Sequence, residues 1–179
     1  MKTSRIQLRL RELAQLFNSM DPTPFLDRDL DADAEEFIMS WAREYPKDHE
    51  LELTIHLTTP PPPERAAGVE EAVHHYFSMR LQIKQHEFQQ LMRRGRVSLF
   101  IGLAFLFGCL FLGQFVARLG SETIATVVRE GLTIMGWVAM WRPLEIYLYD
   151  WWPVHDAQRL LARLTRMHVR LVLPPDTQP

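Results

Sequence analysis

Charged side chains interrupt an apolar stretch towards the C-terminal end of the chain. This stretch, Gly131–Trp152, reads GLTIMGWVAMWRPLEIYLYDWW and contains Arg142, Glu145 and Asp150. On a helix, Arg142, Glu145 and Tyr149 share one face, with Asp150 further round. Ionised side chains within a membrane are unfavourable unless they are paired, so a cluster of this kind marks a candidate functional site.

Several kinds of chemistry suit this cluster. The sequence favours a structural ion pair between Arg142 and Glu145 near the cytoplasmic interface, inside a belt of aromatic side chains. One alternative is a channel or transporter subunit whose permeation path uses the same pair together with Gln114. A second alternative is a membrane enzyme that uses Glu145, Asp150 or His155 at the interface. A contact between subunits is a further use of the pair.

Alternating acidic residues within Asp27–Glu36 have the spacing of calcium ligands. The calcium-loop pattern then fails, because Ala32 stands where the loop needs glycine and Ile38 where it needs a bidentate glutamate. We therefore interpret the stretch as the start of a helix. Asp29 or Asp31 is its candidate N-cap, and the following acidic side chains complement the helix dipole.

Other motifs that carry chemistry are missing or wrongly spaced. His74 and His75 point about 100° apart on a helix, and His86 is too far along to join them in a metal site. We find no nucleophile–base constellation and no glycine-rich phosphate loop. The net charge of −2 gives no case for nucleic-acid binding. We expect no metal, no cofactor and no nucleic-acid partner.

Two stretches have the length of membrane spans. Val97–Val116 carries no charged residue and would extend about 30 Å as a helix, which matches the hydrocarbon thickness. Residues 131–152 supply the second span, whose start lies near Thr123 in an alternative interpretation. A buried helix of a soluble protein is the competing explanation of the first span. We predict a two-helix transmembrane hairpin over residues 97–152.

Basic residues flank this predicted hairpin on its two outer sides. The loop between the spans has only Arg118 and Arg129, each near an acidic residue. By the positive-inside rule, both termini are predicted to be cytoplasmic. The flanking residues that we expect to face lipid headgroups are Arg93, Arg94, Arg96, Arg159, Arg163 and Arg166.

Alternation of apolar and polar residues predicts three strands outside the hairpin. They are Arg5–Leu10, Leu51–Leu57 and Val169–Leu173. An amphipathic helix, Asp31–Tyr45, lies between the first two and permits a right-handed parallel crossover. The outward charges of the first two strands are complementary, as expected for neighbouring strands.

The remaining segments connect this sheet to the membrane. Residues 58–65 are rich in proline and are predicted to be a stiff linker, with an SH3-type ligand as the alternative. Residues 66–96 are predicted to be a long helix that runs directly into the first span. After the hairpin, residues 153–179 are predicted to form an amphipathic helix, Asp156–Met167, and the closing strand.

Two stretches also resemble a known group of proteins. They are NSMDPTPFLDRDLDADAEEFI (Asn18–Ile38) and GWVAMWRPLEIYLYDWWPV (Gly136–Val154). With RRGRVSLFIGLAFL they resemble an uncharacterised family of small two-span bacterial inner-membrane proteins. The resemblance implies placement in the bacterial inner membrane and implies no activity.

The sequence therefore predicts an α+β membrane protein, in which the hairpin is inserted into a small cytoplasmic α/β domain of about three strands. We expect an integral inner-membrane accessory or scaffold protein without enzymatic activity. It would contact membrane lipid and act as a homo-oligomer or as a subunit of a membrane complex. Small residues four apart, at Ala104 and Gly108 and at Gly113 and Ala117, would allow another helix to approach.

Overall fold

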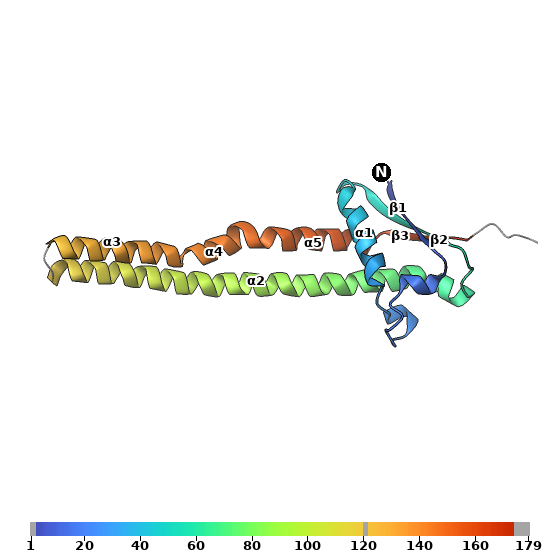
Figure 1. The fold of residues 1–179 in the computed structure, drawn as a ribbon, viewed down its shortest axis with the longest axis horizontal. Helices are drawn as coiled ribbons and strands as arrows, with labels where there is room; N and C mark the ends of the chain where they lie inside the picture. The colour runs from blue at the N-terminus through green and yellow to red at the C-terminus, as the bar shows by residue number, and fades with distance from the viewer. Residues whose placement is uncertain (1–2, 120–121, 174–179) are drawn as a thin grey trace, which may run out of the picture. The chain divides into compact units, whose positions relative to one another are not determined.

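The computed structural model describes residues 3–119 and 122–173, and Figure 1 shows its helices and sheet. The chain forms two compact units. The first, here called the sheet unit, comprises residues 1–84 and 156–179, and the second, the helical unit, comprises residues 85–155. Both ends of the chain therefore contribute to one unit, as the sequence predicts.

Three parallel strands form the sheet, in the order β1-β2-β3. They are β1 (Thr3–Leu10), β2 (Glu50–Leu57) and β3 (His168–Val172). All three predicted strands are confirmed. The prediction that the first two strands are neighbours in the sheet is also confirmed. Arg5 and Glu52 are register partners, and their side chains form an ion pair at 3.0 Å.

Alternation along the strands places apolar side chains on one face of the sheet, where helices cover them. These helices are α1 (Ala32–Glu44), the beginning of α2 (Pro63–Leu119) and α5 (Trp151–Leu164). The side chains that are completely or almost completely buried in this core include Ile6, Leu53, Ile55, Ile38, Val73, Phe77 and Leu164. The opposite face carries polar side chains such as Arg5 and Glu52.

Helix α1 begins where the sequence places its start. Asp31 is the N-cap residue, and its side chain accepts a hydrogen bond of 3.1 Å from the Asp33 backbone N–H. This satisfies one of the unpaired N–H groups at the helix start. The prediction that the acidic stretch initiates a helix is therefore confirmed.

Helix α2 runs without interruption from Pro63 to Leu119. The predicted continuity between residues 66–96 and the first span is found. The linker is shorter than predicted, because Pro63 starts the helix: proline suits the first helical turn, where its missing N–H is not needed. The part of α2 up to Val116 is long and apolar enough to cross a membrane, and only 17% of its most apolar window is buried. Such low burial argues against a core helix of a soluble protein.

The second apolar arm differs from the prediction of one helix over residues 131–152. Helix α3 begins at Glu122 and ends at Ala139, a short helix α4 spans Trp141–Glu145, and a π-helix, η3, spans Ile146–Asp150. The break follows from Pro143, which has no N–H to donate to the Ala139 carbonyl. Among the described residues, α2 alone meets the length and composition of a membrane span, so a second span stays a prediction.

Pro153 does not end the second arm either. It lies in the first turn of α5, which begins at Trp151, five residues before the predicted start at Asp156. Within the helical unit, α3 and α4 pack closely on α2. A Cβ atom on Gly102 would lie 3.1 Å from the Ala139 carbonyl oxygen, and one on Gly136 would lie 2.7 Å from a Leu106 methyl group.

Candidate functional site

The structure brings the three charged residues of the second arm together. The Arg142 guanidinium donates to the Glu145 carboxylate at 2.9 Å, and its Nη1 lies 3.9 Å from the Asp150 carboxylate. Arg142 and Glu145 are three residues apart on α4, where such neighbours meet on one helix face. These three residues are here called the arginine cluster.

The π-helix places Asp150 in this cluster. Its i→i+5 hydrogen bonds make a wider turn, so each residue advances through a smaller angle than in an α-helix. Asp150 is thereby rotated back towards the face that carries Arg142. π-helical segments inside α-helices occur frequently at functional sites, and this one directly follows the proline break.

The arginine cluster is open rather than buried within the described structure. The side chains of Arg142, Glu145 and Asp150 are 63%, 42% and 33% exposed. An ion pair with this exposure contributes about 0–1 kcal/mol to stability. This geometry matches the predicted pair at an interface more closely than a buried pair that encloses a substrate.

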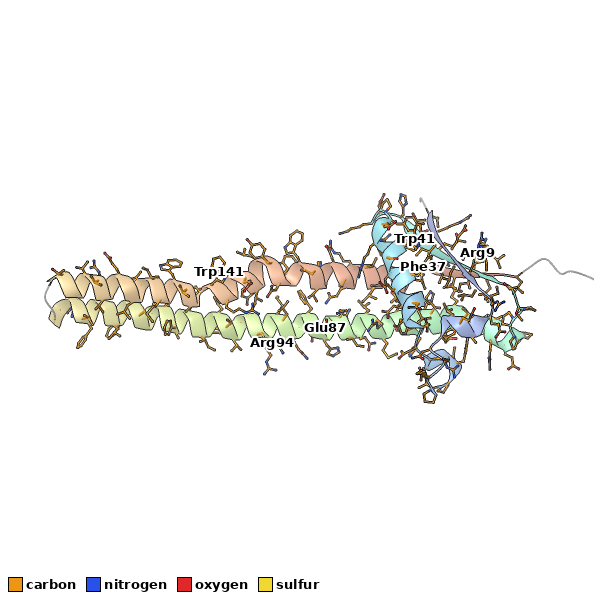
Figure 2. All side chains as sticks on the ribbon, in the orientation of Figure 1. Arg9, Phe37, Trp41, Glu87, Arg94 and Trp141 are labelled. Carbon is orange, nitrogen blue, oxygen red and sulfur yellow. The ribbon has the colours of Figure 1, made fainter. Side chains whose placement is uncertain are left out.

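A groove of about 560 Å³ lies beside the cluster, between α2 and the π-helix. Its charged and polar lining comes from Glu87, Gln90, Arg94, Tyr149 and Asp150. We call it the interface groove. Figure 2 shows Glu87 and Arg94 on α2. Arg94 is among the predicted lipid-facing residues, whereas Glu87 and Gln90 are not predicted. Their signal in the sequence is the i, i+3, i+7 spacing that aligns them with Arg94.

Gln114 does not join the arginine cluster. It follows Gly113, which packs against Arg129, whereas Pro143 packs on Gly102. The distance along α2 from Gly102 to Gln114 is roughly 18 Å at 1.5 Å per residue. A permeation path that combines Arg142, Glu145 and Gln114 is therefore not assembled within one chain.

His155 does not form a catalytic pair with the nearby carboxylates. Its ring lies between Phe88 and Trp151, with ring centroids 6.2 and 5.8 Å away. In the described part of the chain, no hydrogen bond joins His155 to Glu145 or Asp150. A base–carboxylate arrangement at the interface is thus not formed in this structure.

The predicted lipid-facing arginines divide into two groups. Arg93, Arg94, Arg96 and Arg159 are exposed on their helices, and Arg166 is exposed in the turn after α5. Arg163 is instead half-buried within the sheet unit. Its Nη2 donates to the Pro46 and His49 carbonyl oxygens at 2.9 and 3.1 Å. Arg163 thus anchors the turn between α1 and β2, a contact that periodicity in α5 cannot indicate.

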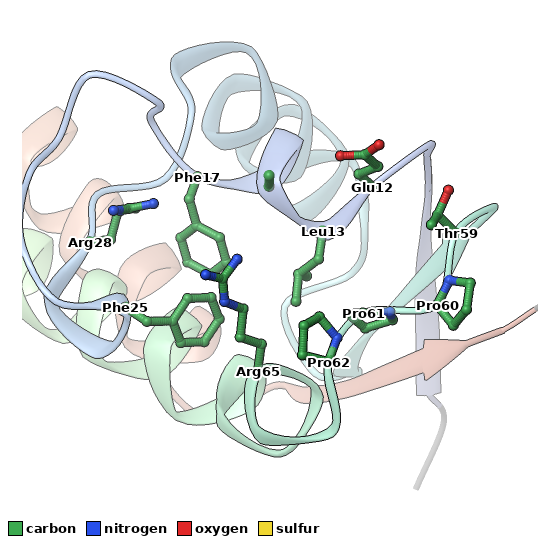
Figure 3. A pocket seen from close by; sticks show the side chains of 11 residues that line it. Glu12, Leu13, Phe17, Phe25, Arg28, Thr59, Pro60, Pro61, Pro62 and Arg65 are labelled. Atoms are coloured by element: carbon green, nitrogen blue, oxygen red, sulfur yellow. The ribbon is translucent and has the colours of Figure 1, made fainter.

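A second cavity, of about 260 Å³, lies in the sheet unit (Figure 3). Phe17 and Phe25, in edge contact at 4.9 Å, form part of its apolar wall. Arg28 and Arg65 bring two guanidinium groups to the lining, and the Arg28 Nε is buried without a hydrogen-bond partner in the described structure. The Glu12 carboxylate lies in the same lining, and the sequence does not reveal this cavity because its parts lie far apart in the chain.

A partly buried polar contact in the same unit connects α1 to α2. The Glu35 carboxylate accepts a hydrogen bond of 2.7 Å from the Tyr76 hydroxyl and two from the Arg80 guanidinium, at 2.6 and 2.8 Å. Burial and this hydrogen bond raise the pKa of Tyr76 well above its ordinary value. Because all three groups are satisfied by one another, we assign them a structural role.

The histidines of α2 are used in structural contacts. His74 Nε2 lies 2.7 Å from the Met167 carbonyl oxygen, and His75 lies 3.4 Å from the Asp27 carboxylate. Among the described residues, no group of three potential metal ligands comes together.

Comparisons with known proteins give no family assignment. No protein-family model, curated protein or solved structure matches this chain. The resemblance to two-span inner-membrane proteins therefore stays a prediction.

Proposed function

We propose that this protein is an integral bacterial inner-membrane accessory or scaffold protein, which acts through self-association or a protein partner rather than by catalysis. The observation that supports this most strongly is helix α2. It supplies buried residues to the core of the sheet unit, including Val73 and Phe77, and continues without a break into the uncharged run Val97–Val116. One helix thus belongs both to a folded domain and to an apolar surface.

The apolar surface of α2 is too large and too exposed to be in contact with water. Phe100, Ile101, Phe107 and Phe111 are each 64% exposed or more. Contiguous apolar surface of this kind marks a contact with lipid or with another protein. Arg93, Arg94 and Arg96 mark the start of the run, as expected for the cytoplasmic side of a span.

We extend the proposal to a multi-pass arrangement with both termini in the cytoplasm. The second pass would use α3, which packs on the apolar part of α2 through Gly136. The break at Pro143 would then lie near the cytoplasmic edge, where Arg142 reaches water by snorkelling. Exposed aromatic residues around the break, such as Trp141 and Trp152, suit the interfacial belt.

Self-association is supported by small residues that no intrachain contact uses. Ala104 is exposed, and a Cβ atom placed on Gly108 would meet nothing within 4 Å. These residues are four apart, so they lie on one helix face and allow close approach of a second helix. By contrast, Gly102 and Gly113 are already packed against the second arm.

Membrane insertion is tested first, by alkaline extraction of membranes from cells that produce the full chain. We expect the protein to stay in the membrane fraction, and reporters fused to either terminus to be active only on the cytoplasmic side. Recovery in the soluble fraction, or a terminus outside, would contradict the proposal.

Self-association is tested with Gly108→Ile, which fills the open face of α2. In nanodiscs or mild detergent, we expect this variant to lose the oligomer that the unmodified chain forms. Gly131→Ile is the matched control, because a Cβ atom on Gly131 also meets nothing within 4 Å. Equal oligomer in both variants would exclude the Ala104–Gly108 face, and a monomer in every preparation would leave a hetero-partner as the form of the proposal to pursue by pull-down.

A further inference from the structure

We propose that the interface groove binds the headgroup of an ethanolamine phospholipid, with the phosphate on Arg94 and the ammonium group on the Asp150 carboxylate opposite. This inference rests on the proposed insertion of α2. It deepens that proposal, because it assigns a lipid class to one place on the protein. The alternatives that it excludes are a general attraction of anionic lipid to arginine and the absence of any lipid preference.

The first observation that supports this lipid class is the set of charges in the groove lining. Arg94 contributes one guanidinium, whose donor fork matches the oxygens of a phosphate. Asp150 contributes a carboxylate, and Tyr149 contributes a hydroxyl. A cation and an anion on the two sides of the groove complement a headgroup that carries one phosphate and one ammonium group.

The environment of Asp150 helps to hold its carboxylate in place. Arg142 lies 3.9 Å from one Asp150 oxygen, on the side of the arginine cluster. Ionised carboxylates have about four acceptor positions, so Asp150 can contact Arg142 and an ammonium group together. The arginine cluster therefore positions a groove residue. The π-helix contributes to the site by placing Asp150 near Arg142.

A second groove on α2 indicates where the acyl chains of the lipid would lie. It measures about 550 Å³ and is lined by Gln90, Arg93, Arg94, Val97, Ser98 and Ile101. Its lining is polar at one end and apolar at the other, and Arg94 belongs to both grooves. A lipid whose phosphate lies on Arg94 can thus place its first methylene groups along Val97 and Ile101.

The depth of the groove agrees with this arrangement. Arg94 precedes the first residue of the uncharged run by three positions, or about 4–5 Å along a helix. This places its guanidinium at the level of the headgroups if α2 is inserted. Trp152, which is exposed two residues beyond Asp150, suits the same level.

The chemistry distinguishes ethanolamine from the other common headgroups. A primary ammonium group donates up to three hydrogen bonds, and the Asp150 carboxylate and the Tyr149 phenol oxygen can accept them. A choline group has no N–H to donate. A glycerol headgroup carries no positive charge, so its phosphate would satisfy Arg94 and leave Asp150 without a cation from the lipid.

The experiment compares lipids bound to the full chain in nanodiscs that contain equal amounts of phosphatidylethanolamine, phosphatidylcholine and phosphatidylglycerol. After release, native mass spectrometry measures which lipids stay bound. We expect at least fivefold enrichment of the ethanolamine lipid, and a stepwise loss for its mono-, di- and trimethylated forms. Arg94→Gln should abolish the enrichment, and Asp150→Asn should reduce the preference over phosphatidylcholine.

Arg96→Gln is the matched control, because Arg96 has the same charge two residues away and lines neither groove. It should keep the enrichment. An equal loss in Arg94→Gln and Arg96→Gln would show unspecific charge attraction, and a preference for phosphatidylglycerol or for no lipid would also overturn the inference.

Two further measurements separate the possible sources and failures. Free phosphoethanolamine at millimolar concentration should not displace the lipid, because it lacks the acyl chains that contact Val97 and Ile101; displacement would show that the site recognises a soluble metabolite. Each variant is checked for membrane insertion by alkaline extraction. Loss of insertion in the unmodified chain contradicts the proposed function, whereas insertion without lipid preference contradicts this inference alone.

Discussion

Glu35 joins two helices through two neighbouring hydrogen-bond donors, Tyr76 and Arg80. Burial, followed by the hydrogen bond to Glu35, raises the pKa of the Tyr76 phenol. For Arg80, burial opposes the charged form, but the hydrogen bond to Glu35 and the electrostatic attraction of Tyr76, Glu35 and Asp29 together outweigh it, and the pKa is raised. Tyr76 is therefore a neutral donor and Arg80 a charged one throughout the physiological range.

Replacement of Tyr76 by phenylalanine is expected to lower the free energy of unfolding by about 1.5–3 kcal/mol, the range for a hydrogen bond to a charged group. The raised pKa means that the folded state holds the phenolic proton more tightly than the unfolded state. This contribution is complete below the unfolded tyrosine pKa of about 10 and is lost as the pH rises above it. Denaturant unfolding in detergent at pH 7 and pH 11 measures both effects. A difference between the two chains that stays constant with pH would contradict the assignment.

The arginine cluster makes a different prediction, because it is exposed. Arg142→Gln, Glu145→Gln and the double variant form a thermodynamic cycle for their pair. We expect a coupling energy below about 1 kcal/mol, measured by unfolding in mixed micelles. A coupling well above this value would show a buried pair and restore the ligand-binding alternative. Loss of membrane-complex assembly in all three variants, with normal folding, would instead indicate a partner contact.

At the scale of elements, glycine contacts decide how the second arm packs on α2. A Cβ atom on Gly136 would lie 2.7 Å from a Leu106 methyl group and 3.3 Å from the Leu106 Cα. Gly136→Val is expected to destabilise the helical unit by about 1–3 kcal/mol through overpacking. Gly131→Val is the control, since it makes the same change in the same helix where the site is open. Unfolding of α3 from α2 in mixed micelles should separate them, and equal stability of the two variants would show that α3 does not pack there.

Some elements of this structure can be predicted from the sequence. Period-two alternation is local, and it identifies all three strands. The complementary charges of Arg5 and Glu52 then indicate that the first two strands are neighbours. The N-cap at Asp31 can be predicted for the same reason, because its hydrogen bond joins residues only two positions apart in the chain. Such features depend on a few neighbouring side chains and on no distant partner.

Other features depend on contacts that the sequence does not display. Helix α3 starts at Glu122, nine residues before Gly131 and next to the alternative start near Thr123, because charges such as Arg129 and Glu130 are tolerated within a helix where they are exposed. Arg163 looks like a surface charge by periodicity, but its partners are carbonyl groups more than a hundred residues away. The interface groove likewise needs Arg94 and Asp150 from separate elements, so neither helix alone reveals it.

At the scale of the whole molecule, the sheet unit is built by two stretches separated by the helical unit. Strand β3 pairs with β2 and not with β1. The C-terminal stretch also supplies the buried side chains of Leu160, Leu161, Leu164 and Met167. The amino-terminal part of the chain therefore lacks one strand and a part of its core.

This arrangement predicts that a chain ending at His155 cannot maintain the sheet unit. Each of the four lost core side chains contributes about 1.5–3 kcal/mol by burial, and their sum is comparable to the whole stability of a typical domain. We expect the backbone amides of β2, Glu50–Leu57, to lose their protection from hydrogen exchange in nanodiscs, while those of the apolar part of α2 keep theirs. Leu164→Ala in the full chain serves as a graded control and should cost about 2–5 kcal/mol. Unchanged protection of β2 after the truncation would show that residues 3–84 fold alone, and the membrane segment would then be an appendage of the domain rather than an insertion within it.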